Sequence, residues 1–184
     1  MTIRERDDAK QRIQESAAQL FAEGGVHGTG LAEISQHAEV SKGTLYYHYT
    51  TKDALVFDVC EIHMSHMINK MYAWLSTVRD DSNSNDAFTE LIEILTDDVF
   101  HVKLHMALCA EAALGQFELQ QLIRTKYGEM GLLLDIASLR MDVKLHESPH
   151  LKQMFFMALD GLMLHSLMGM EAIDSRFLLE RIYK

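Results

Sequence analysis

The sequence predicts an all-α protein, and three observations lead to that prediction. The 184 residues include a single proline, which leaves room for long uninterrupted helices. Apolar residues recur at intervals of three and four along most of the chain, as they do on one face of a helix. Few stretches alternate with the period of two that half-buried strands show, so no sheet is expected. Caps and glycines then divide the chain into about nine helices.

The first 50 residues predict three helices that end in a compact, capped element. Their expected spans are residues 6–23, 31–38 and 42–48. Gly24-Gly25 stops the first helix, Glu39-Val40 forms the turn, and Ser41 is the N-cap of the third helix. A capped aromatic helix after a tight turn is how a helix-turn-helix presents its recognition element.

The rest of the chain predicts longer helices. Their expected spans are residues 51–78, 87–103, 104–114, 117–143 and 149–169, followed by a short helix capped by Asp174 or Ser175. The polar stretch 79–86 is expected to be a loop. Ser148-Pro149 is a strong start signal, a cap followed by proline at the first helical position.

Composition indicates a globular protein. Hydrophobic residues make up 48% of the chain and charged residues 24%, as in ordinary globular domains. No apolar run reaches the ~20 residues of a membrane span, and the charged residues 1–14 do not resemble a signal peptide. Cys60 and Cys109 are too few for a disulfide scaffold. We therefore expect a cytoplasmic protein without membrane contact.

The net charge of −10 argues against a promiscuous nucleic-acid binder. Residues 1–55 contain six basic and eight acidic residues, a net charge of −2. DNA binding by this part would therefore depend on a local patch and on dimerisation.

These features together resemble the TetR/AcrR family of bacterial transcriptional regulators. The resemblance rests on residue types at matching spacing between Ile13 and Leu55, namely Ala17, Leu20-Phe21, Gly25, Thr29, Leu31, Ile34, Ala38, Val40 to Tyr49, Lys52 and Ala54-Leu55. It implies a DNA-binding domain over residues 1–50, with its helix-turn-helix at about 30–49. Residues 51–184 would form the ligand-binding and dimerisation domain, which varies within the family and so names no ligand.

The chain departs from the family pattern at several positions. Glu39 stands at a turn position that is often Gly, where a left-handed backbone costs another residue roughly 1 kcal/mol. Val26 stands where an aromatic residue is common, and Gly30 where Ser or Thr usually caps the second helix. Tyr49 replaces the usual Phe. These changes affect local stability rather than the resemblance.

The resemblance implies that the third helix enters the major groove of double-stranded DNA. Two copies would read a palindromic operator, with their recognition helices about 34–36 Å apart. The expected DNA-contacting residues are Thr29, Ser41, Lys42, Gly43, Thr44, Tyr46, Tyr47, His48 and Lys52. Tyr46 suits core packing and phosphate contact equally well, whereas Leu45 and Tyr49 are expected in the core.

Residues 51–184 contain a candidate effector site rich in His, Met and aromatic residues. The candidates are His63, Met67, Met71, Trp74, Phe88, His101, His105, Cys109, Tyr127 and Met130. Three interpretations stay open: a pocket for a small organic effector, plain core packing, and a metal site. His101, His105 and Cys109 recur every four residues and are ligand types suited to soft or borderline metals. We expect no cofactor, and the effector is not identified.

Residues 154–170 predict a helix that is apolar on all sides, and such a helix is buried on more than one face. One face would pack on its own core through Phe156, Leu159, Met163 and Leu167. The other face would contact a second copy through Leu151, Phe155, Ala158, Leu162, His165 and Gly169. The alternative is a central core helix of a monomer.

Two other classes of protein fit the sequence less well. His101-Val102-Lys103-Leu104-His105 lacks the Glu of a zinc-protease motif, and we find no phosphate loop or nucleophile elbow, so no enzyme is expected. A helical adaptor that binds protein would leave the residues at 41–52 unexplained. We expect a homodimeric, ligand-responsive repressor that a small effector releases from its operator. A metal- or redox-responsive regulator of the same fold is the alternative.

Overall fold

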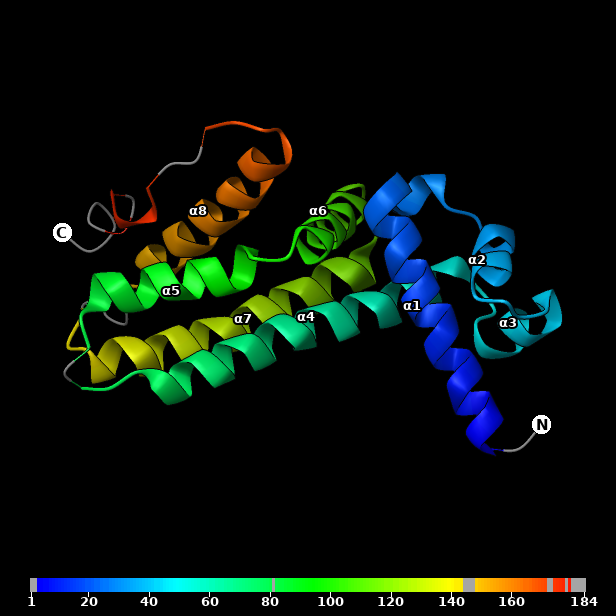
Figure 1. Ribbon diagram of the computed structural model, residues 1–184, viewed down its shortest axis with the longest axis horizontal. Coiled ribbons are helices and arrows are strands. Elements are labelled where there is room, and N and C mark those ends of the chain that lie inside the picture. Colours follow the sequence, from blue (N-terminus) through cyan, green and yellow to red (C-terminus); the bar gives the residue numbers. More distant parts are fainter. Residues whose placement is uncertain (1–2, 81, 144–147, 172–173, 178, 180–184) are drawn as a thin grey trace. The chain divides into compact units, whose positions relative to one another are not determined.

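The computed structural model describes residues 3–80, 82–143, 148–171, 174–177 and 179. All regular structure in these ranges is helical, which confirms the all-α prediction (Figure 1). The helices are α1 (Ile3–Gly28), α2 (Leu31–His37), α3 (Lys42–His48), α4 (Lys52–Thr77), α5 (Ser84–Thr96), α6 (Val99–Ala113), α7 (Phe117–Arg140) and α8 (Pro149–Leu167). Across the described part of the chain, no helix has the length and apolar character that a membrane span requires.

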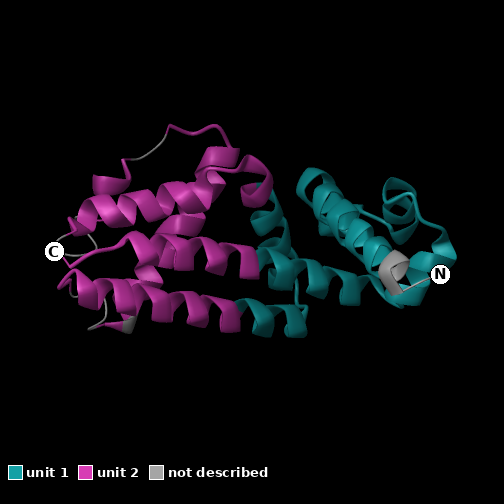
Figure 2. Cartoon of the chain, turned by 60° about the horizontal axis from the view of Figure 1, so that its bottom comes forward, with its two compact units in different colours: residues 1–64, 103–123 teal, residues 65–102, 124–184 magenta. Residues whose placement is uncertain are grey.

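The chain divides into two compact units (Figure 2). Unit 1 comprises residues 1–64 and 103–123, and unit 2 comprises residues 65–102 and 124–184. The helices α1, α2 and α3 lie in unit 1, and α5 and α8 lie in unit 2. The helices α4, α6 and α7 each contribute residues to both units.

The first helix of unit 1 breaks where the sequence predicts a stop. Gly25 leaves the helical conformation with φ +76° and ψ 158°, a region that is open to Gly because it has no Cβ. One further turn follows up to Gly28. The Thr29 hydroxyl donates a hydrogen bond to the Gly25 carbonyl over 2.9 Å, so it satisfies an acceptor at this break.

The helices α1, α2 and α3 pack on one another. The core between them contains Ile13, Ala17, Phe21, Ile34 and Leu45. The N-cap of α2 is Gly30, which has no side chain to offer, but its N–H donates to the Glu33 carboxylate over 3.4 Å. This hydrogen bond from the N-cap N–H to Glu33 partly replaces the missing Ser or Thr cap.

Aromatic side chains fill the core of unit 2. Trp74, Phe88 and Phe155 are fully buried. The ring centroids of Trp74 and Phe88 lie 5.7 Å apart, and those of Phe88 and Phe155 lie 6.0 Å apart. The indole N–H of Trp74 donates to the Ala87 carbonyl over 2.9 Å, which satisfies the polar atom of this buried ring.

The predicted boundary between the fifth and sixth helices was wrong. The structure ends α5 at Thr96 and starts α6 at Val99, whereas the sequence suggested one helix over 87–103. The Asp98 carboxylate accepts a hydrogen bond from the Phe100 N–H over 2.8 Å, as an N-cap does. The start of α5 was also placed late. Asn83 accepts from the Asp86 N–H as the N-cap, so the helix starts at Ser84, three residues before Ala87.

The start of α8 agrees with the prediction, and its end at Leu167 lies two residues before the expected one. Ser148 caps the helix through its hydroxyl, and proline occupies the first turn. The chain turns at Gly169, whose φ is +66°. The sequence suggests a connection at 145–148, of which residues 145–147 lie outside the described residues, as do the C-terminal residues 180–184. Of the expected last helix, the structure describes helical residues 175–177 and 179 after Asp174.

Candidate functional site

The third helix is held by a cap at one end and by buried side chains on one face. The Ser41 hydroxyl accepts a hydrogen bond from the Thr44 N–H over 3.0 Å, which confirms the predicted N-cap. The side chain of Leu45, a residue of α3, is buried, and so is that of Tyr49, the C-cap residue. These two residues are four apart, so they face the same side and turn the rest of α3 outward.

The outward face of α3 presents aromatic and basic groups. Tyr46 and Tyr47 are 53% and 64% exposed, so Tyr46 does not pack in the core. Lys42 is also exposed. The His48 ring contacts the Tyr47 ring edge-on, with centroids 5.0 Å apart. Residues 41–52 contain two lysines and no acidic residue, so this segment is locally positive although residues 1–55 are not.

The turn before α3 has the strained backbone that the sequence indicated. Glu39 has a φ of +52°, in the left-handed region that favours Gly. The Glu39 N–H donates to the Gln36 carbonyl and the Val40 N–H donates to the Ser35 carbonyl. These two bonds hold the tight turn that separates α2 from α3.

Thr29 and Lys52, both expected to contact DNA, lie in different settings. Thr29 is buried, its hydroxyl donates to the Gly25 carbonyl, and its N–H donates to the Val26 carbonyl. We therefore leave Thr29 out of the proposed DNA-contacting surface. Lys52 is half-buried at the first position of α4, next to the end of α3.

Sequence reasoning missed a cluster of polar side chains behind α3. The Tyr49 hydroxyl donates to Asp58 Oδ2 over 2.9 Å and accepts from Gln14 Nε2 over 2.8 Å. Lys10 Nζ lies 3.0 Å from the same carboxylate oxygen. Burial disfavours the charged carboxylate, but hydrogen bonds from Lys10 and Tyr49 outweigh it and hold the pKa of Asp58 below its ordinary value. The only signal in the sequence was Tyr49 in place of Phe.

The His residues predicted for the effector site fall into two groups. In unit 1, His63 Nε2 lies 3.2 Å from His105 Nδ1, and Cys109 Sγ lies 3.6 Å from His105 Nε2. Both His63 and His105 are buried. In unit 2, the rings of His66 and His101 stack with centroids 4.3 Å apart.

His101 lies in an environment that disfavours its protonated form. Burial lowers the pKa of His101 first, and the charge of His66 lowers it further, against the opposing effect of Asp98. In the described ranges, no group of three or more His, Cys, Asp or Glu side chains is arranged to hold a metal ion.

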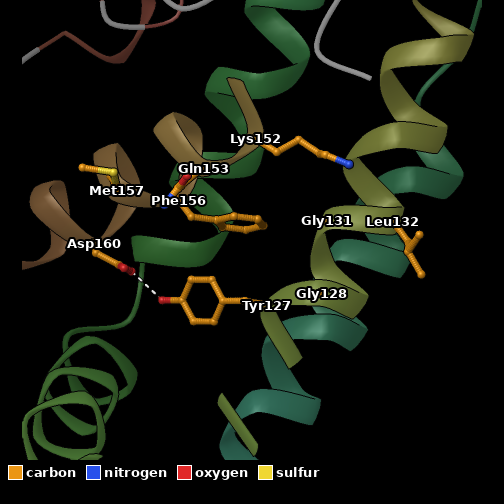
Figure 3. Close-up of a pocket in the computed structure, with 9 residues that line it drawn as sticks. All are labelled: Tyr127, Gly128, Gly131, Leu132, Lys152, Gln153, Phe156, Met157 and Asp160. Carbon is orange, nitrogen blue, oxygen red and sulfur yellow. Dashed lines mark hydrogen bonds between the residues drawn. The ribbon is translucent and has the colours of Figure 1, made fainter. Parts of the chain in front are cut away.

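The remaining buried candidates belong to the core of unit 2. These are Met67, Met71, Trp74, Phe88 and Met130. Of all the residues predicted for effector binding, Tyr127 is the one that also lines a groove between α7 and α8, with a volume of about 420 Å³ (Figure 3). The other lining residues are Gly128, Gly131, Leu132, Lys152, Gln153, Phe156, Met157 and Asp160.

The groove has aromatic walls and a polar group at each end. In Figure 3 the rings of Tyr127 and Phe156 point into the space between the helices, and their centroids lie 5.0 Å apart. The Tyr127 hydroxyl donates to Asp160 over 2.7 Å. Near the other end, Lys152 pairs with Asp135 over 2.6 Å. Gly128 and Gly131 have no side chains to fill this space. Two glycines inside the apolar α7 were the one sequence signal for the groove.

Unit 2 also exposes an apolar face on α7 and α8. Its members are Leu132, Ile136 and Leu139 on α7, and Met154, Met157, Leu164 and Met168 at α8 and its C-cap. The predicted dimer face included Phe155, which the structure instead buries at 1% exposure, with its ring centroid 5.8 Å from that of Phe156. The exposed stripe is therefore rotated by about one residue, roughly 100°, from the predicted one.

The other residues of the predicted dimer face lie beside this stripe. Leu151, Ala158, Leu162 and His165 are half-buried, and Gly169 is exposed. Their part in a contact with a second copy stays a prediction.

Comparison with known proteins agrees with this arrangement. The sequence model of the family described as bacterial regulatory proteins, tetR family, matches residues 13–59. This range covers the helix-turn-helix and the start of α4.

Individual relatives extend the similarity. The chain is 35% identical over 65 residues to the HTH-type transcriptional regulator YerO of Bacillus subtilis, covering 35% of this chain and 22% of YerO. It is 29% identical over 139 residues to IcaR of Staphylococcus epidermidis, the negative transcriptional regulator of the biofilm operon icaADBC, covering 72% and 73% of the two chains. The multidrug binding protein EbrR, solved with ethidium, has the same fold, with a TM-score of 0.75 over 96% of this chain and 99% of EbrR, at 21% identity.

Proposed function

Because the chain belongs to the tetR family of bacterial regulatory proteins, we propose that it is a homodimeric repressor that reads a palindromic operator through α3 and is released by a small organic effector. The observation that carries the proposal is the outward face of α3. It joins exposed Lys42, Tyr46 and Tyr47 on a helix fixed by Ser41 and Leu45. Residues 1–50 serve as the DNA-binding domain and residues 51–184 as the ligand-binding and dimerisation domain.

The residues on α3 would make different kinds of contact with DNA. Lys42, Gly43 and Thr44 lie in the first turn, where a recognition helix approaches base edges. Tyr46, Tyr47 and His48 would contact phosphate, sugar or thymine methyl groups, and Lys52 would contact phosphate. Phosphate contacts fix the register, and base contacts provide the sequence preference.

A second copy would cover the exposed apolar face of α7 and α8. Seven large apolar side chains lie exposed there, and exposed apolar patches on a folded protein mark association sites. A dimer would also supply the second recognition helix. The DNA-binding domain is not basic overall, so it needs a second copy, because one copy makes few phosphate contacts.

The groove between α7 and α8 is the candidate effector site. EbrR, which shares this fold, binds ethidium, and the aromatic walls of the groove suit a flat apolar ligand. Leu132 and Met157 belong both to the groove and to the exposed apolar face. A ligand held there would favour one dimer arrangement over another, which is the differential binding that release from DNA requires.

The direct test is selection of duplexes from a random-sequence pool by the full-length protein. We expect enrichment of a palindrome whose half-sites lie about one helical turn apart, or a multiple of it. Recovery of no common sequence, by a protein that is folded and dimeric, would contradict the proposed function.

A further inference from the structure

The hydroxyl group of Tyr49 has a structural setting that packing alone does not explain. Tyr49 is 3% exposed, and its ring fills the place of the usual Phe in the core of unit 1. The added oxygen donates to Asp58 and accepts from Gln14. A buried phenol needs such partners, and here the chain provides both of them together with Lys10, whose Nζ lies 5.7 Å from the Tyr49 ring centroid.

The cluster joins three helices at one point. Tyr49 is the C-cap residue of α3, Lys10 and Gln14 belong to α1, and Asp58 belongs to α4. Gln14 also reaches the carboxylate of Asp58 directly, over 3.3 Å. We call Lys10, Gln14, Tyr49 and Asp58 the latch. The latch ties the end of α3 to the two helices behind it, and all of its members lie in unit 1.

The helix α3 needs such an anchor because it is short. It has seven residues, of which Leu45 is the buried one, and the Tyr49 ring is buried at its C-cap. Two apolar side chains on one face fix the position of a two-turn helix but leave rotation about the line between them weakly resisted, since apolar packing is not directional. Hydrogen bonds to the far end of the helix are directional, so they oppose this rotation.

We propose that the Tyr49 hydroxyl, held by Gln14 and Asp58, is a positioning group that fixes the orientation of α3 for reading bases. This inference rests on the proposed function. The latch does not touch DNA itself. Its carboxylate stays ionised because Lys10 and Tyr49 donate to it, so the hydrogen bond from Tyr49 is charge-assisted and correspondingly strong.

The latch predicts a specific kind of defect. Tyr49→Phe keeps the ring in the core but removes the hydroxyl, so α3 stays folded and loses its fixed orientation. Base contacts depend on that orientation, whereas non-specific affinity comes from phosphate charge. The ratio of specific to non-specific affinity should therefore fall by about tenfold, which corresponds to about 1.4 kcal/mol, while non-specific affinity stays unchanged.

The experiment compares full-length wild type, Tyr49→Phe and Asp58→Asn on a duplex selected by the wild type and on a scrambled duplex. Tyr72→Phe and Glu61→Gln are matched controls, because they remove an exposed hydroxyl and an exposed carboxylate from α4 outside the latch. All proteins are measured at a temperature where circular dichroism shows them fully folded. Amide hydrogen exchange of residues 45–49 is followed without DNA, with residues 34–38 as the reference.

The latch is supported if Tyr49→Phe lowers the affinity ratio and speeds exchange at residues 45–49 while both controls match the wild type. Equal affinity ratios and equal exchange in Tyr49→Phe and wild type overturn the latch and leave DNA binding intact. An equal loss of affinity for both duplexes also overturns it, since that pattern reports weaker phosphate contact rather than a lost orientation for reading bases. If the wild type enriches no duplex, the proposed function fails, and unchanged exchange in Tyr49→Phe then overturns the latch separately.

Discussion

The Nε2 atom of His63 and the Nδ1 atom of His105 lie 3.2 Å apart inside unit 1. A hydrogen bond between two imidazoles needs one donor and one acceptor nitrogen, so at least one ring is neutral. The Cys109 thiol lies 3.6 Å from the other nitrogen of His105. Replacing His105 by Leu removes a partner of His63 and should lower the free energy of unfolding by about 1–3 kcal/mol.

The double variant His63→Leu/His105→Leu should lose less free energy of unfolding than the sum of the two single variants. Each single variant leaves one buried imidazole without its partner, whereas the double variant removes both. Chemical denaturation measures all three, and His37→Leu, at an exposed position of unit 1, is the control. Strictly additive losses would show that the two rings do not interact.

Glu39 and Gly25 should respond in opposite directions to substitution. Both have positive φ, of +52° and +76°. Glu39→Gly relieves a left-handed backbone and should raise the free energy of unfolding by about 0.5–1 kcal/mol, whereas Gly25→Ala places a Cβ in a Gly-only region and should cost about 1–3 kcal/mol. Thermal unfolding monitored by circular dichroism compares both with the wild type, and a less stable Glu39→Gly would refute the strain assigned to this turn.

The environment of His101 predicts a loss of stability in mild acid. Its pKa in the folded protein lies below the ordinary value of about 6.5, because burial and His66 disfavour the charged ring. Between the two pKa values the unfolded chain binds a proton that the folded chain does not, so the free energy of unfolding falls as the pH drops through about 6.5. Below the folded pKa this contribution is fully lost.

Urea denaturation at several pH values measures this dependence. His101→Gln should flatten the slope near pH 6, and His150→Gln, at an exposed position of unit 2, is the control variant. If His101→Gln shows the same pH dependence of the free energy of unfolding as the wild type, the acid sensitivity comes from other groups.

The exposed face of α7 and α8 predicts a charge-sensitive dimer. Met157 is 67% exposed and lies in the stripe that a second copy would cover. Met157→Glu would bury an unpaired charge there and should weaken the dimer by about 3 kcal/mol or more, roughly 100-fold. Analytical ultracentrifugation reports the change, with Ile62→Glu, at an exposed apolar site of unit 1, as the control. Dimerisation that is unaffected by Met157→Glu would place the interface elsewhere.

Local signals in the sequence predicted those elements that local chemistry determines. The Ser41 cap, the break at Gly25 and the Ser148 start of α8 follow from single residues and their immediate neighbours. The boundary at residues 97 and 98 was missed. There Lys70 donates to both Asp97 and the Ile94 carbonyl over 2.8 Å, a contact from α4 that spans more than 20 residues of sequence. The Asp98 cap was nonetheless a signal that the sequence offered.

The candidate sites depended more on tertiary contacts. The prediction that Leu45 and Tyr49 lie in the core is confirmed, but the sequence left Tyr46 open between core packing and phosphate contact, and the structure exposes it. Phe155 was assigned to the outer face of α8 because that helix is apolar all round, and the contact with Phe88 that buries it joins distant segments. The latch had one sequence signal, Tyr49 in place of Phe, because its partners Gln14 and Asp58 come together only in the folded unit.

The central claim is that the outward face of α3 reads DNA, and one titration tests it most directly. The duplex enriched by the wild type is titrated with wild type and with the double variant Lys42→Ala/Tyr46→Ala, with both proteins folded and dimeric. Losing a base or phosphate contact at each residue should weaken specific binding by about 2 kcal/mol or more, at least 30-fold. Equal affinity of the two proteins for this duplex would contradict the claim that α3 is the recognition helix.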